Sequence, residues 1–393
     1  MIGIVGSGPA ALTAADVISR AGHPVSIYEK RPSPGRKLLI AGSSGLNITN
    51  DLPIEEFIKN YSGFTPEYWL ELLTDFSPSA WLRFISELQI GTFLGTSGRY
   101  LIEEMKAAKF LQAWISKLQS QGVEFHYGQE LTGFSFHPNS KRPQIELNHN
   151  TKLEFNAVCL ALGGGSWEKQ EIPLRWPEIF RRNSLEFEEF NSSNVGYRVA
   201  WSESFLKEAE GLPLKGIELK SSKGTRVGDA IVTAYGIEGT PVYAVATKSL
   251  VHLDLKPDLS PTQIIEKLQS VKENLSPIRR IQKKLNLCIA AQALLFHHSP
   301  KELFNQKDLG AWADTIKNFP LELLGPQPLS EAISSAGGLR TSELNNDLMI
   351  RKFPGFFAAG EMISWDAPTG GFLIQACVSQ GYRAGQAIVN FKK

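Results

Sequence analysis

The sequence predicts an α/β protein in which a Rossmann-like domain is interrupted by a long insertion. Three observations indicate this fold class. Residues 2–28 have the pattern of a strand, a glycine turn, an alanine-rich helix and a second strand, which opens a doubly wound sheet. The apolar run 157–162 ends in glycines, as a buried parallel strand does where it enters a ligand loop. Residues from about 190 to 325 change from an α/β sequence pattern to a β-rich and then a helical pattern, and the α/β pattern of the first domain returns at Ala336.

The first domain is expected to alternate helices and strands after its opening unit. A basic, glycine-rich loop spans residues 32–50. Residues 69–76 and 81–88 then place apolar side chains at helical spacing. Residues 103–121 predict a further helix, which leads into a strand at 123–127 and a hairpin-like region.

The insertion is expected to have two parts. Residues 190–260 are rich in Val, Ile, Thr, Tyr and Gly, which is typical of an antiparallel β domain. Residues 261–325 carry apolar side chains at helical spacing and predict a helical subdomain. The first domain is then discontinuous and comprises residues 1–189 and 326–393.

Composition and charge argue against several functional classes. The formal net charge is +1, with 42% hydrophobic and 21% charged residues, so bulk electrostatics favour neither nucleic acid nor an anionic membrane as a partner. Three separated cysteines without a CxxC pair exclude a disulfide scaffold, a cysteine zinc site and a redox dithiol. No metal-ligand spacing stands out. Without a basic leader or an apolar run of about 20 residues, we expect a cytoplasmic protein.

The N-terminal turn has the spacing of a dinucleotide site. Gly6, Gly8 and Ala11 fit the GxGxxA pattern: Gly6 permits the tight turn, Gly8 admits a pyrophosphate, and Ala11 lets the helix pack closely on the strand. Glu29 ends the second strand about 20 residues later, where a carboxylate accepts hydrogen bonds from ribose hydroxyls. An isolated match can be a structural turn, but here strands, helix and Glu29 are in register. The expected contacts also include Pro9, Ala10 and Lys30.

A second segment, near the C-terminus, decides between FAD and NAD. Residues 353–361 predict a short apolar strand that ends in Gly360 and Glu361. In flavoproteins of the two-dinucleotide-binding type, that strand delivers an acidic residue to the ribityl chain. Residues 369–376 lead into a helix whose N-terminus would face N1 and O2 of the flavin, where negative charge develops on reduction. A structural strand–glycine–helix turn is the alternative. The expected contacts at the helix start are Gly371, Phe372, Leu373 and Ile374.

Several motifs together resemble one bacterial flavoprotein family, which includes aminoacetone oxidase and a dehydro-bile-acid reductase. The motifs are GRK at 35–37, GLNITN at 45–50, SGR at 97–99, MKA at 105–107, ALGG at 161–164, AGGL at 336–339 and the block 360–371. The resemblance covers almost the whole chain and implies an FAD domain with an inserted β domain and a helical domain. Residues 42–47, residues 100–102 and the loop after Gly165 depart from the family pattern, so no substrate is transferred.

The resemblance also places the loop after residue 35 over the flavin. Arg36 and Lys37 would then favour the anionic reduced form, although a solvated basic loop is an alternative for both. Asn47 would hydrogen-bond the ring edge or cap a turn. For catalysis the candidates are Lys37 and Asp366, which lies between the two flavin segments and equally fits a turn or helix cap. The remaining expected cofactor contacts are Leu131, Ala161 and Gly163.

These observations predict an FAD-dependent oxidoreductase that exchanges a hydride with a small organic substrate and uses oxygen or NAD(P)H as second partner. No second full GxGxxG unit follows a strand, so a nicotinamide would dock only transiently. A tRNA-modifying flavoprotein, which the net charge disfavours, and a non-enzymatic FAD sensor remain as alternatives. We expect no nucleic acid or membrane partner. Residues 190–325 are expected to form a substrate lid that adds little to FAD binding.

Overall fold

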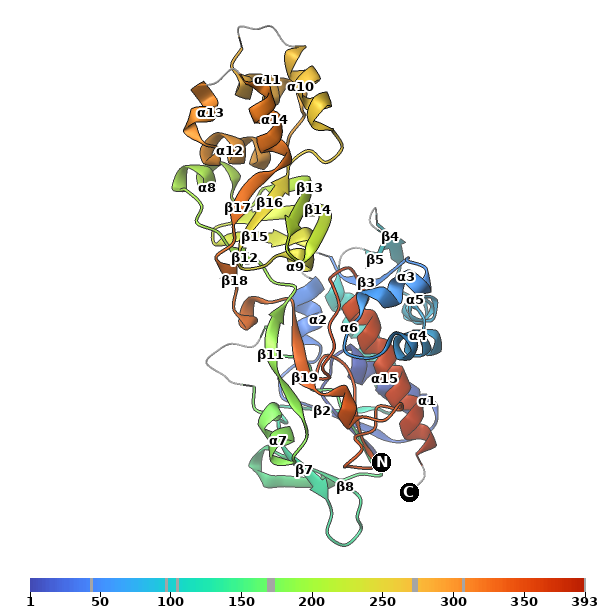
Figure 1. Cartoon of the computed structure of the whole chain (residues 1–393). Helices are drawn as coiled ribbons and strands as arrows, with labels where there is room; N and C mark the ends of the chain where they lie inside the picture. The colour runs from blue at the N-terminus through green and yellow to red at the C-terminus, as the bar shows by residue number, and fades with distance from the viewer. Residues whose placement is uncertain are drawn as a thin grey trace. The chain divides into compact units, whose positions relative to one another are not determined.

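The computed structural model divides the chain into two compact units (Figure 1). Unit 1 comprises Met1–Asn191 and Ile333–Lys393, and unit 2 is the intervening segment Ser192–Ala332. Each unit has its own hydrophobic core. The finer scheme, with a β domain at 190–260 and a helical subdomain at 261–325, stays a prediction. The residues that the structure describes are 1–42, 45–95, 98–103, 106–167, 174–270, 275–305 and 308–391.

Unit 1 is built on a five-stranded parallel sheet of the Rossmann type. The strand order is β6-β2-β1-β10-β20, and every neighbouring pair is parallel. All residues of β1, β10 and β20 are buried, which explains their continuous apolar sequences. The fold class predicted from the sequence is therefore confirmed. The strands are β1 Ile2–Val5, β2 Val25–Glu29, β6 Glu124–Tyr127, β10 Ala157–Leu160 and β20 Phe356–Ala358.

This strand order creates a topological switch point between β1 and β10. From β1 the chain first adds β2 and β6 on one side, and later adds β10 and β20 on the other. In open parallel sheets, ligands bind beyond the carboxyl ends of the strands at such a point. The loops that follow β1 and β10 are the two glycine-rich stretches at 6–8 and 163–165. The topology alone thus selects this edge of the sheet as the place to look for a site.

Helices and smaller sheets surround the parallel sheet. Antiparallel pairing joins β3 to β5 to β4, and β7 to β8 to β9, while β11 pairs with β19. The described helices of unit 1 are α1 Pro9–Arg20, α2 Arg36–Ala41, α3 Ile54–Phe57, α4 Pro66–Asp75, α5 Pro78–Glu87, α6 Ala107–Ser120, α7 Trp176–Arg182 and α15 Phe372–Asn390. The smaller strands are β3 Asn47–Asn50, β4 Thr92–Leu94, β5 Arg99–Ile102, β7 Leu131–Phe136, β8 Pro143–Leu147, β9 Thr151–Glu154, β11 Phe187–Ser193 and β19 Ser334–Leu339.

Local sequence signals set the ends of these helices. Helices α4 and α5 each start with proline after a hydroxyl residue, Thr65 or Ser77, whose side chain accepts the N–H of the residue three positions on. The helix expected at 103–121 begins instead at Ala107. Glu103 donates its N–H to the carbonyl oxygen of Gly91 at 2.9 Å, which ties it to the residue before β4 and not to α6.

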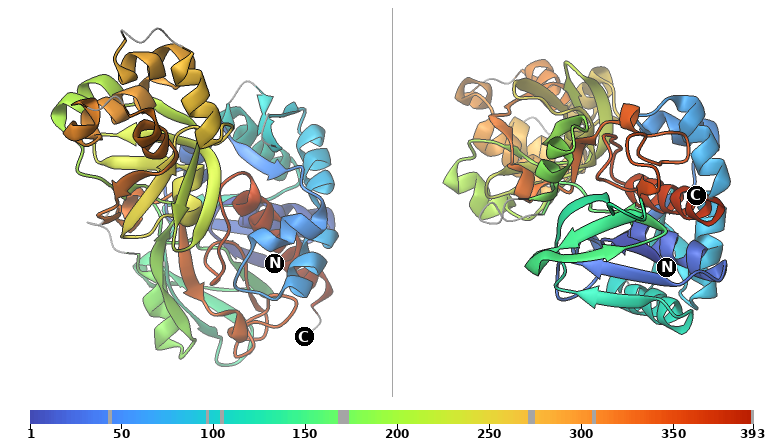
Figure 2. Two further views of the ribbon diagram at one scale, coloured as in Figure 1. Left: turned by 45° about the horizontal axis from the view of Figure 1, so that its top comes forward. Right: turned by 90° about the horizontal axis from the view of Figure 1, so that it is seen from below.

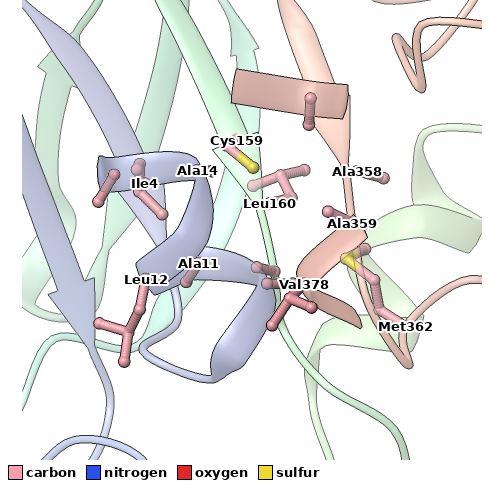
Figure 3. Packing of buried hydrophobic residues seen from close by; sticks show 14 of the residues in the cluster. Ile4, Ala11, Leu12, Ala14, Cys159, Leu160, Ala358, Ala359, Met362 and Val378 are labelled. Atoms are coloured by element: carbon pink, nitrogen blue, oxygen red, sulfur yellow. The ribbon is translucent and has the colours of Figure 1, made fainter. Parts of the chain in front are cut away.

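Helices α1 and α15 bring the two ends of the chain side by side in unit 1 (Figures 1 and 2). They pack closely because the contact positions are small. A Cβ atom on Gly381 would lie only 2.2 Å from the carbonyl oxygen of Ala10. In Figure 3, Ala11, Leu160 and Val378 share one apolar cluster between these helices and β10. Close packing of α15 on α1 therefore fixes the C-terminal segment against the N-terminal turn.

Unit 2 contains a seven-stranded sheet with the order β17-β16-β13-β14-β15-β12-β18. All its pairs are antiparallel, as the Val- and Ile-rich sequence predicted. The strands are β12 Tyr197–Arg198, β13 Pro213–Ser221, β14 Gly224–Thr233, β15 Gly236–Gly239, β16 Leu250–Asp254, β17 Phe319–Glu322 and β18 Gly325–Pro326. The described helices are α8 Glu203–Ala209, α9 Thr240–Val245, α10 Pro261–Gln269, α11 Pro277–Lys284, α12 Ile289–His298, α13 Lys301–Asn305 and α14 Leu309–Lys317.

The segment expected to be helical, 261–325, is helical only up to α14. Strand β17 follows it and joins the sheet through β16. Burial alternates along β17: Phe319 and Leu321 are buried, and Pro320 and Glu322 are exposed. Such a four-residue alternation is the signature of a half-buried strand. Only Asn318, the C-cap of α14, separates it from the helix, which is a weak signal for the change of pattern.

Candidate cofactor site

The glycine turn after β1 closes against the end of β10. The N–H of Gly6 donates to the carbonyl oxygen of Tyr28 at 2.8 Å, and the N–H of Ala161 donates to Val5 at 2.8 Å. Gly6 has φ of +103°, and a Cβ atom on it would lie 2.1 Å from the carbonyl oxygen of Ala161. Only glycine fits both this conformation and this contact. Gly6 therefore serves the packing of the two loops at the switch point.

Gly8 has a different environment. It precedes α1 with φ of −78°, and among the described residues no heavy atom outside its own segment lies within 4 Å of the place where a Cβ would stand. No side chain caps the start of α1, and Pro9 occupies its first turn. Ala10 and Ala11 behind the turn are buried. The helix N-terminus therefore faces open space with a partial positive charge, which suits a phosphate group.

Glu29, at the end of β2, is held beside the turn. Its Oε2 accepts the hydroxyl of Ser7, and its Oε1 accepts the N–H of Arg31 at 2.8 Å. The Ser7 oxygen in turn accepts the N–H of Gly35 at 3.2 Å. One lone pair on each carboxylate oxygen remains for hydroxyl donors. The half-buried Lys30 follows directly.

Leu131 is buried at the start of β7. The residues just before it reach the same edge of the sheet, because Gln129 donates its N–H to the carbonyl oxygen of Glu29 at 2.9 Å. The backbone near Leu131 therefore lies at the end of β2. The Leu131 side chain itself packs in the core of unit 1.

Lys37 and Glu361 form an ion pair at the end of β20. Lys37 Nζ donates to Glu361 Oε2 at 3.3 Å, to Gly164 O at 2.9 Å and to Ser166 Oγ at 3.2 Å. Since an ammonium has three N–H groups, these three acceptors engage all of them. Both side chains are partly shielded, with exposed fractions of 30% and 17%. The pair therefore ties α2 to the loop after β10 and to the loop after β20.

The neighbouring basic residue is also engaged. Arg36 Nη1 donates to the carbonyl oxygen of Trp167 at 3.3 Å. A Cβ on Gly163 would lie 3.8 Å from Lys37 Nζ, so the ammonium stands over this glycine. The structure brings the predicted residues Arg36, Lys37 and Gly163 together around one loop.

The start of α15 contacts β3. A Cβ atom on Gly371 would lie 2.4 Å from the carbonyl oxygen of Thr49, so the backbones touch at this point. The Thr49 hydroxyl donates to Gln375 Oε1 at 2.8 Å. Asn47 begins β3, and within the described part of the chain its buried Oδ1 atom accepts no hydrogen bond. A buried acceptor without a donor is costly, so a ligand N–H would satisfy it.

Phe372, Leu373 and Ile374 form the first turn of α15. The Phe372 ring is buried against Phe57 with ring centroids 4.8 Å apart. Tyr61 donates its hydroxyl to the carbonyl oxygen of Phe372 at 2.8 Å. Burial raises the pKa of Tyr61 well above its usual range, so its hydroxyl keeps its proton. Leu373 and Ile374 are only partly buried at the helix start.

Asp366 makes one local contact and one with a segment far away in the sequence. Its Oδ1 accepts the N–H of Ala367 at 2.9 Å, and its carbonyl oxygen accepts the N–H of Ser62 at 3.0 Å. The contact with Ala367 is a turn interaction, which was one of the alternatives that the sequence offered for Asp366. Asp366 is half-buried and lies between Glu361 and Gly371 in the sequence.

Sequence reasoning missed several polar residues of this site. Ser7 occupies a variable position of the GxGxxA turn, Ser166 follows the glycine run, and Ser335 precedes the Ala-Gly-Gly motif at 336–338. Each hydrogen-bonds a predicted acidic residue. The available signal was their position directly beside a recognised motif. It is weak because serine is common in loops.

Unit 2 has a separate pocket of about 750 Å³. Lys215, Val227, Lys256 and Cys288 are among its lining residues, and none of the predicted cofactor residues belongs to it. Throughout the described ranges, no helix is long and apolar enough to cross a membrane. The same ranges hold no group of three or more His, Cys, Asp or Glu side chains arranged for a metal ion.

Comparison with known proteins identifies the family. The family described as "HI0933-like protein Rossmann domain" matches residues 1–387, nearly the whole chain. The chain belongs to this family. It is a family of FAD-dependent oxidoreductases, so the flavoprotein class and the resemblance inferred from the sequence are confirmed.

Individual relatives of this HI0933-like protein are remote. It is 23% identical over 413 residues to the 3-dehydro-bile acid delta(4,6)-reductase of Clostridium scindens, with 98% of each chain covered. It is 22% identical over 412 residues to the ribosomal RNA dihydrouridine synthase of Escherichia coli K12, covering 99% of this chain and 98% of that one. Among solved structures, the 3-ketosteroid-delta4-(5alpha)-dehydrogenase of Rhodococcus jostii RHA1 has a TM-score of 0.56 at 13% identity, covering 99% and 96%. This likeness shows a shared fold.

Proposed function

We propose that this protein binds FAD non-covalently in unit 1 and exchanges a hydride between flavin N5 and a small organic substrate. Oxygen or NAD(P)H would be the second redox partner. The observation that carries the proposal is the meeting of the glycine turn after β1 with the strand-to-helix segment before α15. A Cβ on Gly360 would lie 3.1 Å from the Cβ of Ala10, so these segments from opposite ends of the chain touch. An NAD dehydrogenase does not need the second segment.

Two observations indicate that the residues present fit the cofactor. The space at Gly8 is open where a pyrophosphate would approach the N-terminus of α1. The buried Asn47 Oδ1 is an acceptor that the described part of the chain leaves unsatisfied, and the ring N–H of a flavin is a donor of the required kind. A bound dinucleotide would account for both features.

The acidic residues divide between the two halves of the dinucleotide. Glu29 is assigned to the adenosine ribose, because Ser7 and Arg31 already orient its carboxylate beside the turn. Glu361 is assigned to the ribityl side, because it directly follows Gly360 at the end of β20. Glu29 would therefore hold hydroxyl groups of the adenosine ribose, and Glu361 would take up a ribityl hydroxyl in exchange for one of its longer hydrogen bonds, to Gly164 or Ser166.

The flavin, when bound, supplies the hydride chemistry, and the protein supplies binding, orientation and charge. The N-terminus of α15 carries partial positive charge, and Lys37 adds an ammonium group that is paired with Glu361. Together they would stabilise negative charge on the reduced ring. Asp366, half-buried between Glu361 and Gly371 in the sequence, is the candidate for orienting substrate or holding a proton.

The substrate is tested by a panel of amines, 2-oxo acids, steroids and enones. Bound flavin is mixed with each compound without oxygen, and its absorbance is followed in the oxidised and the pre-reduced protein. We expect at least one class to bleach or reoxidise the flavin, and NADH or NADPH to reduce it if the enzyme is a reductase. A flavin that no nicotinamide and no member of the panel affects would instead favour the FAD sensor.

A second candidate function is the modification of RNA. The observation in its favour is the similarity to a ribosomal RNA dihydrouridine synthase over nearly the full length, at almost the same identity as to the bile-acid reductase. The net charge of +1 argues against a broad RNA-binding surface. Gel-shift assays with total tRNA and with ribosomal RNA, each at two salt concentrations, discriminate the two functions. Salt-sensitive retardation of the RNA would support a function in RNA modification, and no retardation would support a small organic substrate.

A further inference from the structure

Ser335, on β19, hydrogen-bonds the carboxylate of Glu361, one of the two acidic residues of the candidate cofactor site. We propose that Ser335 is a positioning residue that fixes the Glu361 carboxylate and, through it, the Lys37 ammonium. The inference rests on the proposed function, since it concerns the same site. Ser335 would itself touch no cofactor, and its effect on FAD would pass through Glu361.

Ser335 contacts Glu361 twice. Its backbone N–H donates to Glu361 Oε1 at 2.9 Å, and its hydroxyl donates to the same oxygen at 3.3 Å. The Ser335 oxygen also accepts the N–H of Gly165 at 2.8 Å. Because the oxygen is an acceptor there, the hydroxyl proton is left for the carboxylate, which can only accept. The direction of both hydrogen bonds is therefore fixed.

The other side of the carboxylate is held by the loop after β10. Glu361 Oε2 accepts the Lys37 ammonium at 3.3 Å and the N–H of Gly164 at 3.4 Å. Ser166 donates to Oε1 at 3.4 Å and accepts from Lys37. Ser335 and Lys37 thus hold opposite oxygens of one carboxylate, and the position of the Lys37 charge depends on how Ser335 holds Glu361.

The site leaves little freedom for an alternative arrangement. Ser335 is 1% exposed. A Cβ atom on Gly164 would lie 2.2 Å from the Ser335 hydroxyl oxygen and 2.7 Å from the Glu361 carboxyl carbon. A second bond ties the same strand entry to the same loop, because Trp167 Nε1 donates to the carbonyl oxygen of Ile333 at 3.0 Å. These contacts hold β19 firmly against the loop after β10.

Removal of the hydroxyl has two predictable consequences. The variant Ser335→Ala takes one donor from a carboxylate and leaves the buried N–H of Gly165 without its acceptor. Hydrogen bonds to charged groups are worth more than neutral ones, so the loss should be measurable in FAD binding. The carboxylate should then turn toward Lys37, which changes the charge near the flavin and hence its reduction potential.

The test compares Ser335→Ala and the size-matched Ser335→Cys with Ser26→Ala, an equally buried serine of β2 whose hydroxyl contacts Met1 and Glu124. We expect both Ser335 variants to weaken FAD binding about tenfold and to shift the flavin midpoint potential, while Ser26→Ala binds FAD within about twofold of the unchanged protein. If Ser335→Ala does not fold, Ser335→Cys carries the comparison, because it keeps the side-chain volume.

The same substitutions in a Glu361→Ala background, which removes the acceptor of both Ser335 hydrogen bonds, separate positioning from general stability. If Ser335 acts through the carboxylate, the effect of Ser335→Ala on FAD affinity should fall to about twofold or less in that background. An equal effect in both backgrounds, or Ser335 variants that bind FAD as well as Ser26→Ala, would overturn the inference. Failure of the unchanged protein to bind FAD at all would instead overturn the proposed function.

Discussion

Replacement of Gly8 by valine tests whether the N-terminal turn receives a phosphate. Gly8 has an ordinary φ of −78°, and its Cβ position is open, so Gly8→Val should change the stability of the FAD-free protein by less than about 1 kcal/mol. A phosphate oxygen bound to this turn must come within about 3 Å of a backbone nitrogen, and the valine side chain would occupy its approach. Loss of two charge-assisted hydrogen bonds predicts an FAD affinity lower by at least ~3 kcal/mol, more than about 100-fold.

Gly6→Ala is the matched control, because its effect should fall on the fold. Its Cβ would lie 2.1 Å from Ala161 O in a backbone with φ of +103°, which predicts a destabilisation of roughly 2–5 kcal/mol. Thermal unfolding without FAD and titration with FAD measure the two effects separately. The reasoning would be refuted if Gly8→Val bound FAD with unchanged affinity, or if it lost stability as Gly6→Ala does.

Three further predictions concern Glu29, the inserted unit and the reactivity of the cysteines. Glu29→Gln should weaken FAD binding about tenfold, because a carboxylate oriented by Ser7 is replaced by a neutral amide; unchanged affinity in a titration would show that Glu29 does not hold the ribose. Replacement of residues 191–325 by a short Gly/Ser linker should leave FAD bound, with faster oxidation of reduced flavin by oxygen and lost substrate specificity, because all predicted FAD contacts lie in unit 1; a soluble truncation without FAD would place essential contacts in the insertion. Burial raises the pKa of Cys159 to about 12, so in timed alkylation at pH 8 the half-buried Cys288 should react first, and equal rates would contradict this.

Local patterns were sufficient for the framework of unit 1. Strands β1 and β10 are short apolar runs followed by glycines, and α1 is an alanine-rich helix that begins at Pro9. Each signal lies within about ten residues, where periodicity and turn chemistry act directly. The strand order, and with it the switch point, was not predicted, because it depends on pairings such as that of β1 with β10, which lie far apart in the sequence.

The polar network at the site could not be predicted in the same way. Ser166 and Ser335 converge on Glu361 from segments far apart in the sequence, and neither belongs to a periodic pattern. From the sequence, Lys37 could belong to a solvated loop, stabilise charge on the flavin or take part in catalysis. The structure gives its ammonium three acceptors. Which groups surround a side chain depends on tertiary packing, and single-sequence patterns do not encode it.

The identity of the cofactor tests the central claim most directly. The purified protein is denatured by heat, the precipitate is removed, and the flavin in the supernatant is identified by chromatography and quantified against protein. The proposal predicts a yellow protein that releases FAD, at about one molecule per chain, from a site built by Gly8, Glu29 and Glu361. A colourless protein that FAD cannot reconstitute, release of FMN instead, or colour retained in the precipitate would contradict non-covalent FAD binding.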